Sequence, residues 1–400
     1  MDLTELRVLV VEDHGFQRAI ALRLLAELGI EGDRALQAAD GASALALLQR
    51  QAEPPDVVLV DLDMPGMDGI EFITHLAQRR LVRSIALVSA LDPALLNTVN
   101  VMARAYGLRM LGVIEKPLTV DKLRSLLLAH RAQDWTDRDI DAPVEIAPGE
   151  LGAALENGDI LPWFQLQVEL GNGKPIGVEA LARWQRGDRM VGPLQFIPQM
   201  EREGLARALT DSILAQACEW RQRWLRDHGL KLAMAINVSP TALADPGVAD
   251  HYEELVGAHG MSPEDVVLEI TESSVLADFA RGLGVMARLR LKGFGLSIDD
   301  FGVGYSSLAQ LSQIPFTELK IDRGFVADAQ KNSRHRAVVE ASLELARKLH
   351  LASVAEGVET EAEWQFLAER GCGLAQGFLI SRPVPGEAIP SVLACWRRPH

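Results

Sequence analysis

The stretch "SIDDFGVGYSS", residues 297–307, places two adjacent aspartates, Asp299 and Asp300, where an apolar run ends and a glycine-rich turn begins. Parallel strands bring their carboxyl ends to one edge of a sheet, where ligand sites form. Two like charges at such an edge repel each other and take up protons unless cations hold them. The pair therefore predicts a strand end that holds metal ions, with both carboxylates at the mouth of a site or at its rim.

Seven similar strand-like runs alternate with helical patterns in the same part of the chain, which has about 250 residues, the usual size of a single (β/α)₈ barrel. The second to the seventh of the eight runs carry acid, amide or lysine groups at or near their C-terminal ends. In chain order, the eight runs are WFQLQVEL (163–170), IGVEALARW (176–184), LAMAINVS (232–239), VVLEITES (266–273), GLSIDDFG (295–302), ELKID (318–322), ASVAEGVE (352–359) and LAQGFLIS (374–381).

Several carboxylates and one lysine are thereby expected to converge on one barrel mouth. Oxygen ligands at this density suit Mg²⁺ or Mn²⁺ and do not suit zinc. A carboxylate that bridges two cations is the usual centre of a site for phosphoryl displacement. The residues expected at the mouth are Glu179, Asn237, Glu269, Glu272, Asp299, Asp300, Lys320, Glu356, Glu359 and Gln376.

These motifs, including Glu179-Ala180-Leu181, resemble the EAL family of cyclic di-GMP phosphodiesterases over about residues 150–385. The resemblance implies hydrolysis of cyclic di-GMP to linear pGpG with two Mg²⁺ or Mn²⁺ ions. It implies one metal at Glu179, Asn237, Glu269 and Asp299, and a second metal with its water at Asp299, Asp300 and Glu356. Lys320 and Glu356 are alternative candidates for the general base.

The resemblance also implies substrate contacts at Gln165, Leu181, Arg183 and Gln376. It assigns the coupling of dimerisation to metal binding to Glu272 and the loop with Gly302, Gly304, Ser306 and Ser307. Glu359 is either a surface acid or a supporting residue of the site. The family commonly has tyrosine-glutamine-proline near the first strand, where this chain has Phe164-Gln165-Leu166. EAL barrels commonly pair, so a homodimer or a higher homo-oligomer is expected.

The N-terminal part also alternates strand-like runs with helical patterns, which predicts a doubly wound parallel sheet. The runs are LRVLVVED (6–13), PDVVLVDLDMPGMDG (55–69), SIALVSA (84–90) and LGVIEKP (111–117). Acids end two of these strands, a serine and a lysine end the others, and such a group can hold Mg²⁺ and a phosphoryl group. A tight turn, for which a cis peptide is one option, is expected at Pro117.

These runs resemble the receiver domain of two-component response regulators, over roughly residues 5–130. The resemblance implies a phosphoryl acceptor at Asp61 and a histidine kinase or phosphotransfer protein as its donor. It also implies a Mg²⁺ site and a phosphate sensor, formed by Glu12, Asp13, the backbone of Asp63, Ser89 and Lys116. The family often has an aromatic residue three positions before the lysine, and here that position is Val113.

The sequence predicts a flavodoxin-like receiver domain over 1–130, a linker over 131–149 and a TIM-type EAL barrel over 150–400. The net charge of −15 argues against a DNA- or RNA-binding surface. Three scattered cysteines fit a reduced cytosol. Because no signal peptide and no apolar run of about 18 residues is found, a cytoplasmic chain without a membrane span is expected.

Two other functions remain open at this level. The barrel could be a catalytically weak receptor that binds cyclic di-GMP, although its metal-ligand positions are intact. The receiver could alternatively serve as an interaction module that titrates a phosphotransfer partner, which needs only Asp61. The chain has no GGDEF motif and no helix-turn-helix after the receiver, which argues against synthesis of the nucleotide and against direct transcriptional control.

Overall fold

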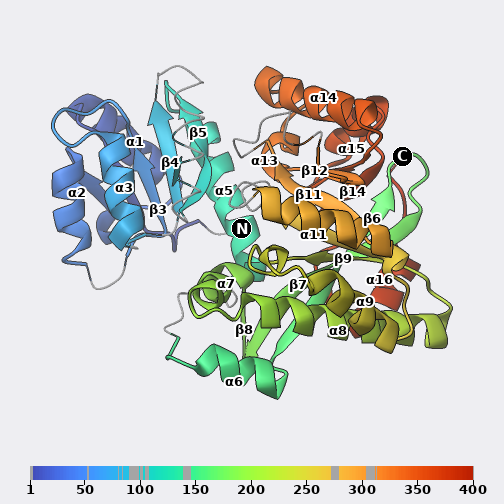
Figure 1. Ribbon diagram of the computed structural model, residues 1–400. Helices are drawn as coiled ribbons and strands as arrows, with labels where there is room; N and C mark the ends of the chain where they lie inside the picture. Colours follow the sequence, from blue (N-terminus) through green and yellow to red (C-terminus); the bar gives the residue numbers. More distant parts are fainter. Residues whose placement is uncertain are drawn as a thin grey trace. The chain divides into compact units, whose positions relative to one another are not determined.

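The computed structural model describes residues 3–51, 54–79, 81–82, 84–89, 99, 102–103, 108–137, 146–271, 279–302, 311 and 313–399. The chain divides into two compact units, Met1–Arg138 and Asp139–His400 (Figure 1). Helix α5 (Val120–Asp137) continues past residue 130, where the linker was expected to begin. Among the described helices, none combines the length and the apolar character that crossing a membrane requires.

The first unit is built on a parallel sheet with strand order β2-β1-β3-β4-β5, which confirms the doubly wound fold. The strands are β1 (Val8–Val11), β2 (Ala35–Ala38), β3 (Val57–Val60), β4 (Ser84–Ser89) and β5 (Arg109–Glu115). The other described helices of this unit are α1 (Gly15–Glu27), α2 (Gly41–Leu48) and α3 (Gly69–Arg79).

Alternating side chains of these strands feed two separate hydrophobic clusters. Leu9 and Val11 belong to the cluster that includes residues of α2 and α3, whereas Val8 and Val10 belong to the cluster that includes residues of α1 and α5. Successive strand residues point to opposite faces, so a sheet covered on both sides needs strands that are apolar throughout. This requirement explains the uninterrupted "VLVV" run of β1, whose carboxyl end leads directly to Glu12.

In the second unit, eight described strands close into a ring in the order β6-β7-β9-β10-β11-β12-β13-β14, which confirms the predicted barrel. Each of the eight predicted runs overlaps one of these strands. They are β6 (Ile160–Glu169), β7 (Pro175–Arg186), β9 (Ala233–Asn237), β10 (Val266–Thr271), β11 (Gly295–Phe301), β12 (Glu318–Ile321), β13 (Ala352–Ala355) and β14 (Leu374–Gln376). Two short strands lie outside the ring: β8 (Arg189–Val191) pairs with β7, and β15 (Val384–Pro385) pairs with β6.

Strand β6 differs from the all-parallel pattern of a TIM barrel, because it runs antiparallel to both β7 and β14. Its connection to β7 is a tight turn closed by a hydrogen bond from the Gly173 amide to the Glu169 carbonyl. Such a short connection joins antiparallel strands, since parallel neighbours need a crossover of a dozen or more residues. Side chains of β6 therefore lie directly opposite those of β7 and of β14.

Helices surround the ring, as Figure 1 shows for α8, α9, α11 and α14. The described helices of this unit are α6 (Glu150–Asn157), α7 (Pro193–Arg202), α8 (Ala206–His228), α9 (Val248–Ala258), α11 (Phe279–Lys292), α13 (Arg323–Val326), α14 (Ser333–Lys348), α15 (Glu361–Glu369) and α16 (Ile389–Cys395). Trp184, Trp224 and Trp364 are buried in the shared core. Trp224 meets Phe164 of β6 edge to face, with ring centroids 4.9 Å apart.

Candidate functional site

A β-bulge brings both aspartates of the 297–307 stretch to one place. The register of β11 against β12 shifts between Ile298 and Phe301, and Asp300 adopts a φ of 55°. In a regular strand, adjacent side chains point to opposite faces, whereas a bulge redirects one of them. Asp299, Asp300 and Glu356 consequently offer carboxylate oxygens that all lie within 4.8 Å of one another.

The ammonium group of Lys320, on β12, stands among four carboxylates. Its Nζ lies 2.6 Å from Glu356 Oε1, 2.7 Å from Glu269 Oε1, 3.4 Å from Asp299 Oδ1 and 3.5 Å from Glu179 Oε2. The Lys320 side chain is 1% exposed. The strands β7, β10, β11 and β12 and the end of β13 thus deliver these groups to one centre, as the sequence predicted.

The cluster carries more negative than positive charge. It holds five carboxylates and one ammonium, because Asp300 lies beside Asp299 and Glu356. Burial and the neighbouring charges raise the pKa of Glu356 to about 8 and that of Asp300 to about 6. Burial and the charge of Glu179 raise the pKa of Glu269. Burial alone would lower the pKa of Lys320, but the surrounding carboxylates raise it overall.

Amide side chains hold Glu179 from both sides. Asn237 Nδ2 donates to Glu179 Oε1 at 3.0 Å, and Gln376 Nε2 donates to Glu179 Oε2 at 2.5 Å. Burial opposes ionisation of Glu179, but the charge of Lys320 and these hydrogen bonds lower its pKa overall. The surroundings of Glu179 therefore favour its ionised form.

The donor set fits hard divalent cations. It consists of carboxylate oxygens and the side-chain amide of Asn237, and the excess negative charge needs positive counter-charge. Asn237 uses its amide nitrogen toward Glu179, so its carbonyl oxygen is the atom that can serve as a ligand. When no cation is bound, protons can neutralise these carboxylates instead. The raised pKa values of Glu269 and Glu356 show this tendency to take up protons.

The predicted substrate contacts divide into two groups. Leu181 and Arg183 are half-buried near the end of β7, and the Arg183 guanidinium lies 5.9 Å from the centroid of the Trp163 ring. Gln165 and Gln376 are instead buried beside Glu179, and Gln376 Nε2 donates to Gln165 Oε1 at 2.9 Å. Their contact with substrate stays a prediction.

The predicted coupling loop is described only at its start. Gly302 has a φ of 101°, and a Cβ added there would lie 3.0 Å from the Phe325 ring, so this position needs glycine. Glu359 is exposed, and its backbone amide donates to Glu363 Oε2 at the start of α15. The other predicted loop residues lie outside the described part of the chain, namely Glu272, Gly304, Ser306 and Ser307.

Two residues of the amide network were not anticipated from the sequence. Gln167 Nε2 donates to Gln376 Oε1 at 3.0 Å, and the Ser381 carbonyl accepts from Gln165 Nε2 at 2.9 Å. The signal for Gln167 was present, because it lies two residues after Gln165 and so faces the same side of β6. No comparable signal marked Ser381, which follows the last ring strand.

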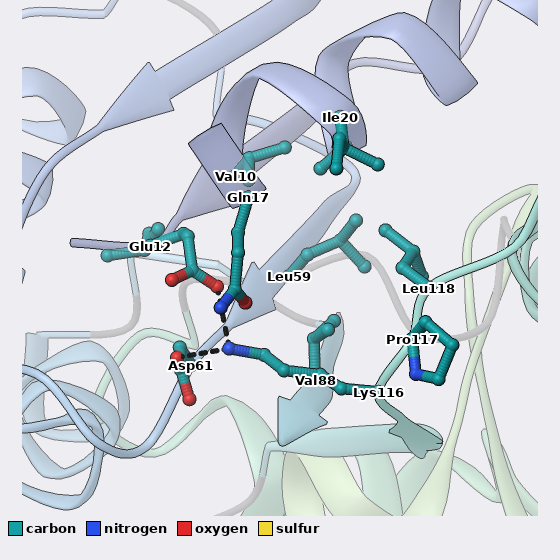
Figure 2. Close-up of a pocket in the computed structure, with 12 residues that line it drawn as sticks. Val10, Glu12, Gln17, Ile20, Leu59, Asp61, Val88, Lys116, Pro117 and Leu118 are labelled. Carbon is teal, nitrogen blue, oxygen red and sulfur yellow. Dashed lines mark hydrogen bonds and ion pairs between the residues drawn. The ribbon is translucent and has the colours of Figure 1, made fainter. Parts of the chain in front are cut away.

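The receiver unit holds a second acidic group at the carboxyl ends of β1 and β3. Glu12, Asp13 and Asp61 offer carboxylate oxygens within 4.8 Å of one another. Lys116 Nζ lies 2.6 Å from Asp61 Oδ2 and 3.0 Å from Glu12 Oε2, as Figure 2 shows. Although burial opposes it, hydrogen bonds to both acids raise the pKa of Lys116. The Asp63 backbone amide donates to Asp61 Oδ1 at 3.3 Å.

The other predicted receiver residues lie where the sequence placed them. Ser89 is buried at the end of β4, and the Lys116-Pro117 peptide is cis. Val113, at the position where the family often has an aromatic residue, is 40% exposed. A cavity of about 370 Å³ reaches from Asp61 and Lys116 to apolar side chains of the sheet and α1, including Leu59 (Figure 2).

Comparisons with known proteins agree with this architecture. A family model described as "EAL domain" matches residues 149–383, and one described as "Response regulator receiver domain" matches residues 8–128. The chain is 34% identical over 390 residues to cyclic di-GMP phosphodiesterase RocR of Pseudomonas aeruginosa, across 96% of this chain and 98% of that protein.

Two further matches cover a smaller share of the chain. The chain is 39% identical to bifunctional diguanylate cyclase/cyclic di-GMP phosphodiesterase MucR of Pseudomonas aeruginosa, across 61% of this chain and 36% of that protein. The solved complex of the PaMucR phosphodiesterase with c-di-GMP has a TM-score of 0.57 and 40% identity, across 60% of this chain and 98% of that one. The chain belongs to the EAL domain family and joins its EAL barrel to a response regulator receiver domain.

Proposed function

We propose that this chain is a response regulator whose barrel hydrolyses cyclic di-GMP to linear pGpG. The observation that carries the proposal is the group of four carboxylates around buried Lys320, with Asp300 beside them, at the ends of the barrel strands. Two relatives of the barrel are named as cyclic di-GMP phosphodiesterases. Negative charge grows on the phosphate as the bond breaks, and divalent cations held by such carboxylates would neutralise it.

Two divalent cations, Mg²⁺ or Mn²⁺, are proposed as cofactors. The residues that would hold them are Glu179, Asn237, Glu269, Asp299, Asp300 and Glu356. When bound, the cations supply activation of a water molecule and neutralisation of phosphate charge. In the receiver, Glu12, Asp13 and the Asp63 backbone would hold one Mg²⁺ beside Asp61.

Glu356 is proposed as the group that takes a proton from the attacking water. Its side chain is 18% exposed, so it reaches the mouth, whereas the Lys320 side chain is 1% exposed. Lys320 would instead orient Glu356 and Glu269 through its two short contacts.

Arg183 is proposed to hold a substrate phosphate, because its forked donors suit phosphate oxygens and its position beside Trp163 is half-buried. Leu181, on the same strand, would pack against the nucleotide at the rim. Gln165 and Gln376 are proposed to act behind this rim, where they support Glu179.

The test compares Glu179→Gln with Glu254→Gln, a matched change of an exposed acid on α9. Conversion of cyclic di-GMP is measured by chromatography in saturating Mg²⁺. The Glu179 variant should lower the rate at least about 100-fold, because it loses a metal ligand. Loss of a residue that only hydrogen-bonds to a metal ligand typically has a smaller effect. The Glu254 variant should keep the wild-type rate. Equal rates for Glu179→Gln and wild type would contradict the site assignment.

Regulation by the receiver is the second part of the proposal. Asp61 would accept a phosphoryl group from a histidine kinase or phosphotransfer protein and thereby alter the hydrolysis rate of the barrel. The support is the buried Glu12–Lys116–Asp61 group, which a phosphoryl group on Asp61 must rearrange. Beryllofluoride, a mimic of the phosphorylated acid, should change the wild-type rate and leave Asp61→Asn unchanged. An unchanged wild-type rate would refute the coupling.

A homodimer or higher homo-oligomer is also expected, since EAL barrels commonly pair. Light scattering of the full chain measures this directly, with and without beryllofluoride. A monomer in both conditions would exclude a role of dimer geometry in the regulation.

A further inference from the structure

Glu179, on β7, is supported by a hydrogen-bonded group of three glutamines from two other strands of the ring. Gln165 and Gln167 lie on β6, and Gln376 lies on β14. The antiparallel registers place Gln165 opposite Glu179 and Gln376 opposite Gln167. The pairing therefore brings the four side chains together, and each is less than 8% exposed.

Among these glutamines, Gln167 donates to Gln376, and Gln376 donates in turn to Glu179 and to Gln165. Gln376 Nε2 donates to Glu179 Oε2 at 2.5 Å and to Gln165 Oε1 at 2.9 Å. Both amide hydrogens of Gln376 are thus used, and its Oε1 accepts from Gln167 Nε2 at 3.0 Å. Gln165 in turn donates to the Ser381 backbone carbonyl at 2.9 Å.

The orientation of the Gln376 amide matters because an ionised carboxylate can only accept hydrogen bonds. If the amide turned over, its oxygen would face Glu179 Oε2 and repel it. Gln167 prevents this by offering a donor to Gln376 Oε1, and the turned amide would set two donors against each other there. Little water reaches these buried groups to compensate for a lost partner.

We propose that Gln167 is a positioning residue for the barrel's cation site, acting on Glu179 through Gln376. The inference rests on the proposed function, in which Glu179 holds a divalent cation. Gln167 touches neither the cation nor the substrate. Its role is to keep the Gln376 amide turned so that Glu179 presents its carboxylate in one fixed orientation, as outer partners of metal ligands do.

The experiment measures Mn²⁺ affinity directly in the full chain. All proteins carry Asp13→Ala, which removes an acid of the receiver site, and free Mn²⁺ is followed by electron paramagnetic resonance. Gln167→Met keeps most of the side-chain volume but has no amide donor. We expect it to raise the Mn²⁺ dissociation constant by roughly 10-fold or more, the range typical of outer partners. The KM for cyclic di-GMP at saturating Mn²⁺ should change little.

A double-mutant cycle separates positioning from a general packing effect. In a Gln376→Met background, Gln167→Met should have no further effect on Mn²⁺ affinity, since the residue it acts through is gone. A packing defect would instead lower affinity by the same factor in both backgrounds, and that result would overturn the proposal. If Gln167→Met does not fold, Gln167→Asn serves the same test, because its amide is too short to reach Gln376 Oε1.

Two failures are distinguishable. If the parent protein binds Mn²⁺ and Gln167→Met binds it equally well, the positioning role is refuted and the proposed function stands. If the parent binds no Mn²⁺ at the barrel, the proposed function and this inference are both overturned.

Discussion

Replacing Lys320 by methionine tests whether its ammonium group holds the acidic cluster together when no cation is bound. The variant keeps a similar side-chain length but leaves Glu179, Glu269, Asp299 and Glu356 without their shared partner. Removing one member of a buried ion pair costs about 3–5 kcal/mol. For a domain of this size, about 2–4 °C of melting temperature corresponds to 1 kcal/mol, so we expect a decrease of roughly 6–20 °C in EDTA.

The decrease should depend on pH in a defined direction. Without the ammonium, the pKa values of Glu269 and Glu356, which are already raised in the folded chain, rise further above their values in the unfolded chain. An acid whose pKa is raised by folding destabilises the folded state only as pH rises above its unfolded value of about 4. The melting temperature of Lys320→Met should therefore lie closest to wild type near pH 4.5 and farthest below it near pH 8. Mn²⁺ should restore more stability to the variant than to wild type.

Tryptophan fluorescence is the appropriate signal, because six of the seven tryptophans lie in residues 139–400. Lys331→Met is the matched control, since Lys331 is 78% exposed and its ion pair with Asp328 spans 3.6 Å. Exposed pairs contribute little, so the control should melt within about 2 °C of wild type. If Lys320→Met in EDTA at pH 8 also melted within about 2 °C of wild type, the account of the cluster would be refuted.

Three further predictions follow from the same geometry. In EDTA, the free energy of unfolding of the wild type should fall as pH rises from about 4.5 to about 8, because folding raises the pKa of Asp300 to about 6 and of Glu356 to about 8. Urea titrations that show rising stability over this pH range would contradict the prediction. Ca²⁺ should support nucleotide binding but little hydrolysis, since its loose coordination fixes water poorly; full turnover in Ca²⁺ would count against two fitted cation positions. Gly302→Ala should lower the free energy of unfolding by about 1–2 kcal/mol, because Gly302 has a φ of 101° and the Phe325 ring blocks the added methyl group. An unchanged free energy of unfolding would show that the loop adapts freely.

The sequence predicted the elements of both units well where the hydrophobic runs were long. All eight ring strands and four of the five receiver strands coincide with such runs. The exception is β2, whose "ALQA" is a short edge strand and mostly half-buried. Edge strands bury fewer side chains, so the apolar pattern that marks a strand is weaker there.

Other features depended on pairing that a single run of residues does not encode. The bulge that turns both Asp299 and Asp300 into the site arises from the register against β12. The group of glutamines behind Glu179 follows from the antiparallel pairing of β6, which the sequence did not predict, and from the registers of three strands. Lys320 was predicted at the mouth, whereas its position among four carboxylates follows only from closure of the ring.

The most direct test of the central claim is the fate of cyclic di-GMP incubated with the full chain and Mg²⁺, followed by chromatography. The account predicts that linear pGpG accumulates, that EDTA abolishes its formation, and that added Mg²⁺ restores it. If the nucleotide bound tightly but remained uncleaved under these conditions, the chain would be a cyclic di-GMP receptor, and the catalytic role assigned to the acidic cluster would be wrong.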